Sequence, residues 1–400
     1  MKFRADFLIH HIDSLWKKLT LYLNVTNLRM VLQELNIINF KNITGASLEF
    51  SPRFNCLVGK NGMGKTNILD AIYHLSMCKS YFNHSDVQNI NHDQSFFVIQ
   101  GKYVCEDENI DIYCGVKKGQ KKVFKKNQKP YAKFSEHIGL LPLVMISPED
   151  FSLIEGGSEE RRQMIDSIIS QCDHEYLHRL IRYNRALTQR NSLLKSYAGK
   201  PFDPEVIEIW DEQLAEHGEV IMQKRLDFVQ DFHALFQFFY KQLSLGREEV
   251  NLLYKPSVPS GQFLNVLKDN LGKDHILTYT SSGCHRDDLQ LNIGQYSVRK
   301  TGSQGQKKTF LIALKLAQYT WLAKAVHVKP LLLLDDIFDK LDADRVNQII
   351  NIVGSEDFGQ IFITDTNREH LDEILKNQHI DFTLFQVDNG EVNPFFVQKQ

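Results

Sequence analysis

The spacing of apolar residues predicts different secondary structure in separate stretches of the chain. Short alternating or continuous apolar runs at 31–58 and 96–134 predict β-strands. Apolar residues at helical spacing predict two long helices, from about 158 to 197 and from about 205 to 243. Each would be roughly 60 Å long if unbroken, because an α-helix rises about 1.5 Å per residue. Ser158 is the expected N-cap of the first helix.

Strand-like patterns return in the last part of the chain. The four leucines at 331–334 are typical of a buried parallel strand, and 360–364 has the same character. The residues at 382–392 predict a hairpin that turns at Asp388, Asn389 and Gly390.

These patterns divide the chain into four segments. We expect an N-terminal extension at 1–29, and an α/β lobe formed by 30–150 together with 276–400. A helical lobe at 151–275 is inserted between the two parts. The extension has weak helical spacing and no signal-peptide pattern, so we expect it to be poorly ordered. Since strand-like sequence begins at Met30, a second interpretation is that the true start lies there.

Composition limits the functional classes without selecting one. The net charge of -2 argues against a protein coated in positive charge, although a local basic stripe can still bind nucleic acid. The 6 cysteines include no C-x-x-C pair, so neither a zinc ribbon nor a disulfide framework is expected. A reduced cytosolic setting fits this cysteine pattern best. No apolar run is long enough to cross a membrane, so no membrane partner is expected.

A phosphate-binding loop is the first chemical motif. Residues 59–66 fit the pattern G-x-x-x-x-G-K-[ST] between an apolar strand and a predicted helix, which is the context that the motif requires. Glycines let backbone N–H groups surround phosphate oxygens, and the helix N-terminus adds its positive end. We expect Lys65 to reach the β and γ phosphates and Thr66 to bind magnesium. The predicted ATP-binding residues are Gly59, Lys60, Asn61, Gly62, Met63, Gly64, Lys65 and Thr66.

The leucine strand at 331–334 is followed by two acids, as in a Walker B motif. An acid at the carboxyl end of a buried strand lies at the sheet edge where ligands bind. We expect Asp335 to hold magnesium and Asp336 to orient or activate the attacking water. The predicted catalytic residues are Asp336 and the phosphate-binding Lys65. Alone, the two acids are equally well explained as a turn after a core strand. The upstream phosphate-binding loop favours the catalytic interpretation.

The residues at 302–308 precede a predicted helix and resemble the ABC-type signature. In that signature, serine and glycine groups at a helix start touch a γ-phosphate, which selects Ser303, Gly305 and Gln306 here. A simple serine helix cap is the alternative interpretation. The position of the string, shortly before the Walker B strand, favours the signature.

In this order, the three motifs resemble the ABC-type ATPase head. The resemblance implies a P-loop NTPase with an α/β fold, in which a mixed sheet, an antiparallel subdomain and an inserted helical lobe are combined. In that family, the signature of one molecule faces the P-loop of another. The resemblance therefore implies an ATP-dependent homodimer that binds ATP and Mg²⁺ between its subunits.

Five strings resemble the RecF family in particular, over the chain from about residue 30 to its end. They lie at 39–42, 67–71, 147–150, 283–288 and 303–306. The resemblance implies a cytoplasmic bacterial ATPase that binds single-stranded, double-stranded and gapped DNA in an ATP-dependent way. It also implies that the protein acts with RecR and RecO in RecA loading, replication restart and the SOS response.

The chain departs from the related patterns at a few positions. Cys284 stands where RecF proteins usually carry proline, and we expect it to touch no phosphate. Transporter-type ATPases have glutamate where Asp336 stands, and the shorter side chain is consistent with slow hydrolysis. They also carry a histidine just after the strand that ends near Thr364, where this chain has Asp365 and Thr366, with His370 further on. Which residue senses the γ-phosphate therefore stays open.

Two basic segments are candidates for DNA binding. The first is a lysine-rich stretch at 117–133, with Phe124 and Tyr131 available for base stacking. Its lysines are Lys117, Lys118, Lys121, Lys122, Lys125, Lys126, Lys129 and Lys133. The second is the set of arginines on the first long helix, which comprises Arg179, Arg182, Arg185 and Arg190. A solvated hairpin and a hydrated helix face are the respective alternatives, and both stay open.

Two other classes of protein share this head. A transporter ATPase would carry a glutamine in the loop that enters the helical lobe, and the segment at 147–150 has none. An SMC-like chromosome protein would separate the P-loop from the signature by a heptad-patterned tether far longer than this interval. A compact ATP-gated DNA clamp therefore fits the sequence best.

Overall fold

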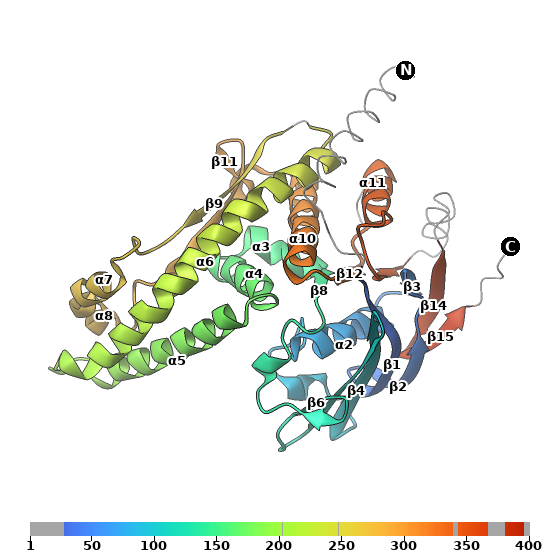
Figure 1. Ribbon diagram of the computed structural model, residues 1–400, viewed down its shortest axis with the longest axis horizontal. Helices are drawn as coiled ribbons and strands as arrows, with labels where there is room; N and C mark the ends of the chain where they lie inside the picture. The colour runs from blue at the N-terminus through green and yellow to red at the C-terminus, as the bar shows by residue number, and fades with distance from the viewer. Residues whose placement is uncertain (1–27, 202, 247, 339–342, 367–380, 396–400) are drawn as a thin grey trace.

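The computed structural model describes residues 28–201, 203–246, 248–338, 343–366 and 381–395. All but Leu28 and Arg29 of the expected N-terminal extension therefore lies outside the described residues, as does His370. Two six-stranded sheets form one end of the molecule, and a pair of long helices projects from them (Figure 1). Within the described part of the chain, no helix combines the length and apolar character that crossing a membrane requires.

The first sheet is antiparallel and has the order β2-β1-β4-β5-β6-β7. Its strands are β1 (Met30–Phe40), β2 (Ile43–Glu49), β4 (Phe96–Cys105), β5 (Glu108–Lys117), β6 (Val123–Lys126) and β7 (Lys129–Pro130). The expected antiparallel strands in this part of the chain are confirmed.

The second sheet has the order β15-β14-β3-β13-β12-β8, and only β15 runs antiparallel to its neighbour. Its strands are β3 (Phe54–Val58), β8 (Leu143–Ile146), β12 (Leu331–Asp335), β13 (Ile361–Asp365), β14 (Phe382–Asp388) and β15 (Glu391–Phe395). The central strands come from both ends of the chain, because β3 pairs with β13 and β13 with β12. The predicted buried strands and the closing hairpin are confirmed.

Helix α2 (Lys65–Met77) packs between the two sheets. The leucines of β12 alternate, as the two-residue period of a strand requires. Leu331 and Leu333 belong to the core that contains α2 and the antiparallel sheet. Leu332 and Leu334 belong to the core on the opposite face, with α10 (Gln304–Val326) and the helical lobe. The parallel sheet is thus covered on both faces, which explains its continuous apolar strands.

The second long helix was predicted correctly, and the first was not. Helix α6 (Glu205–Leu243) is unbroken, whereas the segment at 158–197 forms α4 (Ser158–Ser170) and α5 (His174–Ser196). The Asp173 carboxylate accepts a hydrogen bond from the Tyr176 N–H at 2.9 Å and so starts a new helix. Ser158 is not the N-cap of α4, because Gly157 occupies that position and the Ser158 hydroxyl accepts from Arg162.

A small antiparallel sheet interrupts the helical lobe. It has the order β11-β10-β9, with β9 (Val250–Lys255), β10 (Asp288–Ile293) and β11 (Tyr296–Ser297). Strand β9 lies in the segment expected to be helical, and it pairs with β10 beyond the expected boundary at 275/276. The expected boundary therefore separates two strands that pair with each other. The division into lobes stays a prediction. The remaining helices are α3 (Ser152–Glu155), α7 (Phe263–Asp269), α8 (Leu271–Leu277), α9 (Val298–Thr301) and α11 (Ala343–Val353).

Helices α6 and α10 join the helical lobe to the parallel sheet. The rings of Phe236 on α6 and Phe310 on α10 lie 4.6 Å apart between centroids, and those of Phe228 and Trp321 lie 4.8 Å apart. The signature residues lie at the N-terminus of α10. Their position is therefore fixed by aromatic packing against α6, as well as by the sheet beneath α10.

A buried ion cluster fastens the outer part of the lobe. The Arg190 guanidinium, which is 0% exposed, contacts the carboxylates of Asp211 at 2.5 Å and Asp274 at 2.7 Å. It also donates to the Thr280 hydroxyl at 2.9 Å. Burial raises the pKa of Asp211, while Arg190 opposes that rise. The cluster ties α5 to α6 and α8.

We predict that Arg190→Ala lowers the free energy of unfolding by about 3–5 kcal/mol, because it leaves two buried carboxylates without their cation. Arg185→Ala is the matched control, since Arg185 is exposed on the same helix. It should change stability by less than about 0.5 kcal/mol. Urea unfolding of both variants measures the difference, and equal small effects would contradict the structural role of Arg190.

Candidate functional site

The loop at 59–66 connects β3 to α2 and has the backbone that phosphate binding requires. Gly62 and Gly64 have φ values of 81° and 113°, in the left-handed region that favours glycine. A Cβ at Gly59 would lie 2.2 Å from the Val387 carbonyl oxygen. Side chains at these positions would therefore displace the loop or strain its backbone.

The loop is held in place by two neighbouring turns. The Asn42 amide, in the turn after β1, donates to the Met63 carbonyl at 3.1 Å and accepts from the Asn67 amide at 2.7 Å. In the turn after β14, the Gly390 N–H donates to the same Met63 carbonyl at 2.9 Å. Sequence reasoning used Asn42 only as part of a family string and missed its contact with the loop. Asn42 follows a predicted strand and lies well before residues 59–66 in the sequence, so no sequence pattern predicted its contact with the loop.

Lys65 lies inside the loop at the start of α2. Its Nζ donates to the carbonyl oxygens of Gly59 at 2.7 Å and Lys60 at 3.1 Å. Burial lowers the pKa of Lys65, while the carboxylates of Asp336 and Asp335 oppose that shift. The ammonium group is therefore next to the loop centre, where phosphate oxygens would give it better partners than two neutral carbonyls.

Thr66 and Asp335 meet at the adjoining sheet edge. The Thr66 hydroxyl donates to Asp335 Oδ1 at 2.9 Å, and the Thr364 hydroxyl donates to the same atom at 2.8 Å. Strand register brings these residues together, because Asp335 lies beside Thr364 and Thr364 beside Leu57. Burial raises the pKa of Asp335, while the two hydroxyls oppose that rise. The structure thus brings together the two residues predicted to hold magnesium.

Asp336 has a backbone conformation that sets it apart from the strand. Its φ is 50°, in the left-handed region, and its N–H donates to the Thr364 hydroxyl at 2.9 Å. Thr364 therefore contacts both residues of the motif, Asp336 through its backbone and Asp335 through its carboxylate. Sequence reasoning missed Thr364, because a threonine at the end of a β-strand has an ordinary strand-forming role as its simplest explanation.

The residues fit magnesium and a nucleotide phosphate chain. A buried carboxylate with a raised pKa beside a hydroxyl is an arrangement that a divalent cation would stabilise. Magnesium usually keeps several waters and takes only one or two carboxylates from a protein. Thr66 and Asp335 are few enough protein ligands for such a site.

The signature forms a reciprocal cap at the start of α10. The Ser303 hydroxyl accepts from the Gln306 N–H at 3.2 Å, and the Gln306 side-chain oxygen accepts from the Ser303 N–H at 2.7 Å. Gln306 also donates to Glu248 at 2.5 Å. In the part of the chain that the structure describes, these hydrogen bonds do not connect the signature to the loop at 59–66. Ser303 itself is exposed.

The lysine-rich stretch divides into buried and exposed positions. Lys122 pairs with Asp86 at 2.7 Å and donates to the Cys78 carbonyl at 2.6 Å, so it anchors the hairpin to the end of α2. Phe124 is 1% exposed and belongs to the core, so its predicted role in base stacking is wrong. The exposed lysines that remain are Lys117, Lys118, Lys121, Lys129 and Lys133.

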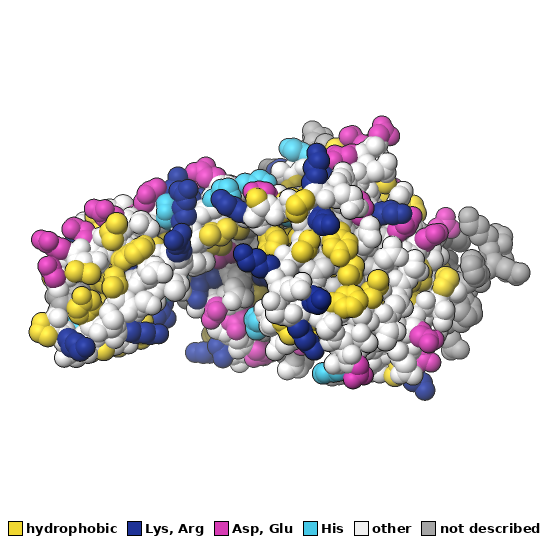
Figure 2. All heavy atoms as spheres, turned by 90° about the horizontal axis from the view of Figure 1, so that it is seen from below, with side chains coloured by type: hydrophobic (Ala, Val, Ile, Leu, Met, Phe, Trp, Pro, Cys, Tyr) yellow, Lys and Arg dark blue, Asp and Glu magenta, His cyan; other side chains and the backbone are white. Residues whose placement is uncertain are grey.

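The arginines of α5 divide in the same way. Arg182 and Arg185 are exposed, and Arg179 pairs with Glu175. Arg190 is buried in the ion cluster, so it is neither a DNA contact nor part of a hydrated helix face. On the face shown in Figure 2, Lys and Arg side chains are scattered rather than gathered in one field.

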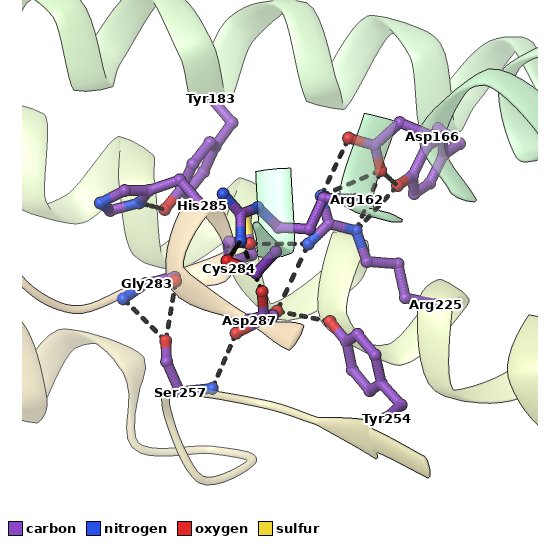
Figure 3. Close-up of polar contacts among 12 residues, drawn as sticks. Arg162, Asp166, Tyr183, Arg225, Tyr254, Ser257, Gly283, Cys284, His285 and Asp287 are labelled. Atoms are coloured by element: carbon purple, nitrogen blue, oxygen red, sulfur yellow. Dashed lines mark hydrogen bonds and ion pairs between the residues drawn. The ribbon is translucent and has the colours of Figure 1, made fainter. Parts of the chain in front are cut away.

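The string at 283–288 forms a buried polar network in the helical lobe (Figure 3). Asp287 accepts from the Ser257 N–H at 2.7 Å and from the Tyr254 hydroxyl. Arg225 on α6 donates to the Cys284 carbonyl at 2.6 Å. Burial raises the pKa of Cys284 to about 12, which makes its thiol unreactive. The string therefore fastens α6 to β9 and β10.

The candidates for sensing the γ-phosphate begin at the end of β13, with Asp365 and Thr366. Burial lowers the pKa of Lys65, and the Asp365 carboxylate lies close enough to oppose that shift, after Asp336 and Asp335. The Asp365 carbonyl accepts from the Gly59 N–H at 3.4 Å. Thr366 is exposed. The third candidate, His370, lies outside the described residues.

Comparison with known proteins gives a consistent result over nearly the whole chain. The model of the RecF/RecN/SMC N terminal domain family matches residues 31–390. The DNA replication and repair protein RecF of Phocaeicola vulgatus is 52% identical over 365 residues, which cover 91% of this chain and 98% of that protein. The protein of the same name from Flavobacterium johnsoniae is 49% identical over 359 residues, covering 90% and 100%.

Solved structures agree with the sequence relatives. The recombination mediator protein RecF-ATP of the RecFOR pathway superposes with a TM-score of 0.83 at 30% identity, over 92% of this chain and 98% of that one. An Smc head domain from Pyrococcus furiosus gives a TM-score of 0.55 at 16% identity over 92% and 96%, which shows a shared fold alone. The predicted ABC-type head fold is confirmed, and the chain belongs to the RecF family.

Proposed function

We propose that this chain is an ATP-gated DNA-binding protein of recombinational DNA repair and replication restart. The observation that carries the proposal is the contact between Thr66 and Asp335, which joins the P-loop to the Walker B strand. The names of the relatives support the assignment to DNA replication and repair. A cytoplasmic location is part of the proposal and rests on the family resemblance.

ATP would bind with its phosphates in the loop at 59–66. Lys65 would exchange its two carbonyl partners for the β and γ phosphates, while the backbone N–H groups surround the phosphate oxygens. Thr66 and Asp335 would hold Mg²⁺, which neutralises charge on the phosphates. The RecF structure with ATP supports this nucleotide.

Asp336 would orient or activate the attacking water. Its backbone N–H donates to Thr364, whose hydroxyl also contacts Asp335, so Thr364 would hold this backbone beside the Asp335 carboxylate. A general base must be held within hydrogen-bond reach of the proton that it removes. The short aspartate side chain is consistent with slow turnover.

The signature would act on ATP that is bound by a second copy of the chain. Gln306 already occupies the Ser303 N–H, so the donors that remain are the Ser303 hydroxyl and the N–H groups of Gln304 and Gly305. These donors lie at an exposed helix N-terminus, which favours a phosphate. ATP would then join two subunits, and its hydrolysis would release them.

DNA would be the macromolecular ligand, with RecR and RecO as protein partners and RecA loading and SOS induction as outcomes. Support for these partners comes from the family resemblance and from the RecFOR pathway of the solved relatives. In this chain, the exposed lysines of the turn between β5 and β6 are the strongest candidates for phosphate contact.

We expect Asp336→Asn to slow ATP hydrolysis by about 100-fold or more while ATP binding changes little, because it removes the base without changing side-chain size. Asparagine also tolerates the left-handed backbone at this position. Asp335→Asn is the comparison and should mainly weaken magnesium-dependent ATP binding. Single-turnover hydrolysis and an ATP titration measure both effects, and unchanged turnover in Asp336→Asn would disprove the role of Asp336.

Charge reversal at Lys118 and Lys121 should weaken DNA binding and leave ATP binding unchanged. If both lysines contact phosphates, the slope of log affinity against log salt should become shallower by about 1.8, since each contact contributes about 0.9. The matched control reverses Lys195, in the last turn of α5, and Lys200, which follows that helix, and both are exposed. An unchanged slope in the Lys118 and Lys121 variant would return the stretch to the solvated-hairpin interpretation.

The protein should be monomeric without nucleotide or with ADP, and dimeric with ATP and magnesium. Ser303→Arg should abolish the dimer and keep ATP binding, because the added side chain lies on the partner-facing surface. Ser303→Thr keeps the hydroxyl and the helix cap, so it should still dimerise. Sedimentation in ATP and ADP tests the proposal, and one oligomeric state under all conditions would contradict it.

A further inference from the structure

A carboxylate of the helical lobe holds the signature glutamine. Glu248 lies between α6 and β9, and its Oε1 accepts from Gln306 Nε2 at 2.5 Å. Its other oxygen accepts from the hydroxyl of Tyr240, a buried residue near the end of α6. The signature is therefore connected through one side chain to the longest helix of the lobe.

Glu248 determines which way the Gln306 amide faces. An ionised carboxylate can only accept hydrogen bonds, so the Gln306 nitrogen must point toward Glu248. The amide oxygen then points toward the Ser303 N–H and accepts from it at 2.7 Å. Without Glu248, the Gln306 amide could rotate and turn its NH₂ group toward the Ser303 N–H. Two donors would then face each other, and the reciprocal cap would break.

The reciprocal cap in turn controls the groups that a phosphate would meet. It fixes the Ser303 hydroxyl as an acceptor from the Gln306 N–H, so that the hydroxyl hydrogen stays free to donate outward. It also keeps the N–H groups of Gln304 and Gly305 in the first turn of α10, without partners inside the helix. Loss of the cap would disorder all three donors together.

The first turn of α10 is also attached through Lys307, but that contact does not orient the Gln306 amide. Lys307 pairs with Glu155 of α3 at 2.7 Å, which attaches the first turn of α10 to α3. Among the described residues, the Lys307 ammonium donates to Glu155 and not to the Gln306 amide, so it does not select the orientation of that amide. The hydrogen bond that the Gln306 amide donates to Glu248 is therefore the contact that orients this amide from the helical lobe.

We propose that Glu248 is a positioning residue for the signature, and that it makes ATP-dependent pairing of two copies depend on the helical lobe through Tyr240, Glu248 and Gln306. The inference rests on the proposed composite ATP site. It adds a residue that touches neither ATP nor the partner copy. Because α6 runs through the whole lobe, a change in its position would reach the signature through this contact (Figure 1).

The test compares Glu248→Ala with Glu248→Gln in the full chain. Glu248→Ala should raise the dissociation constant of the ATP-bound dimer by roughly 10-fold or more, the range expected for a hydrogen bond to a charged group. ATP affinity of the monomer should stay within about twofold of the unmodified chain. Glu248→Gln retains an oxygen that accepts from Gln306, so it should recover most of the pairing. Glu249→Ala, at the exposed neighbouring carboxylate, should have no effect.

A double-mutant cycle separates positioning from general loss of stability. In a Gln306→Ala background, Glu248→Ala should have no further effect on dimerisation, because the contact that it removes is already absent. Additive effects, or normal pairing by Glu248→Ala, would overturn the inference. If Ser303→Arg still blocks the dimer in that case, only the role of Glu248 fails. If the unmodified chain does not pair in ATP, the proposed composite site fails as well.

Discussion

The hydrogen bond between Thr66 and Asp335 is the contact on which the functional site depends. It joins residues that are 269 positions apart, and Thr364 contacts the same carboxylate oxygen from the strand between them. This geometry requires β13 to lie between β3 and β12 with matched carboxyl ends. The segment between the two motifs can therefore change in length or structure only if β12 and β13 still pair beside β3.

In the proposed ATP site, one copy would supply only part of the phosphate contacts. The P-loop and Walker B residues meet at a sheet edge, while the signature is at the start of α10 and is held by Glu248 and Glu155 of the helical lobe. Aromatic packing between α6 and α10 keeps the signature fixed relative to the lobe. A second molecule could then supply donors to the γ-phosphate without a large rearrangement of either copy.

Sequence patterns predicted the helices and strands that depend on their own residues rather than on distant partners. Helix α6 follows from its apolar spacing, and the four leucines of β12 follow from burial on both faces. The break between α4 and α5 depends on the Asp173 cap competing with good helical spacing, so periodicity alone misses it. Arg190 and Phe124 could not be placed from sequence. Their burial depends on partners far along the chain, Asp274 for Arg190 and the core between the sheets for Phe124.

The candidate site shows the same division. The loop at 59–66 and the pair Asp335 and Asp336 carry recognisable motifs, so the sequence identified them. Asn42 and Thr364 hold those groups in place and were missed, because a turn asparagine and a strand threonine have ordinary structural explanations. Positioning residues of this kind are visible only when the fold brings distant segments together.

A mixing experiment tests the shared ATP site most directly. Lys65→Ala removes the lysine of the P-loop, Ser303→Arg blocks the signature, and each variant alone should hydrolyse little ATP. A mixed dimer contains one site with an intact P-loop from one copy and an intact signature from the other. The arginine faces the P-loop that binds no ATP, where the phosphates would otherwise lie. We predict that mixing restores ATP hydrolysis well above the sum of the separate variants. Activity equal to that sum, in a mixture in which sedimentation shows the mixed dimer, would show that the site is not shared between two copies.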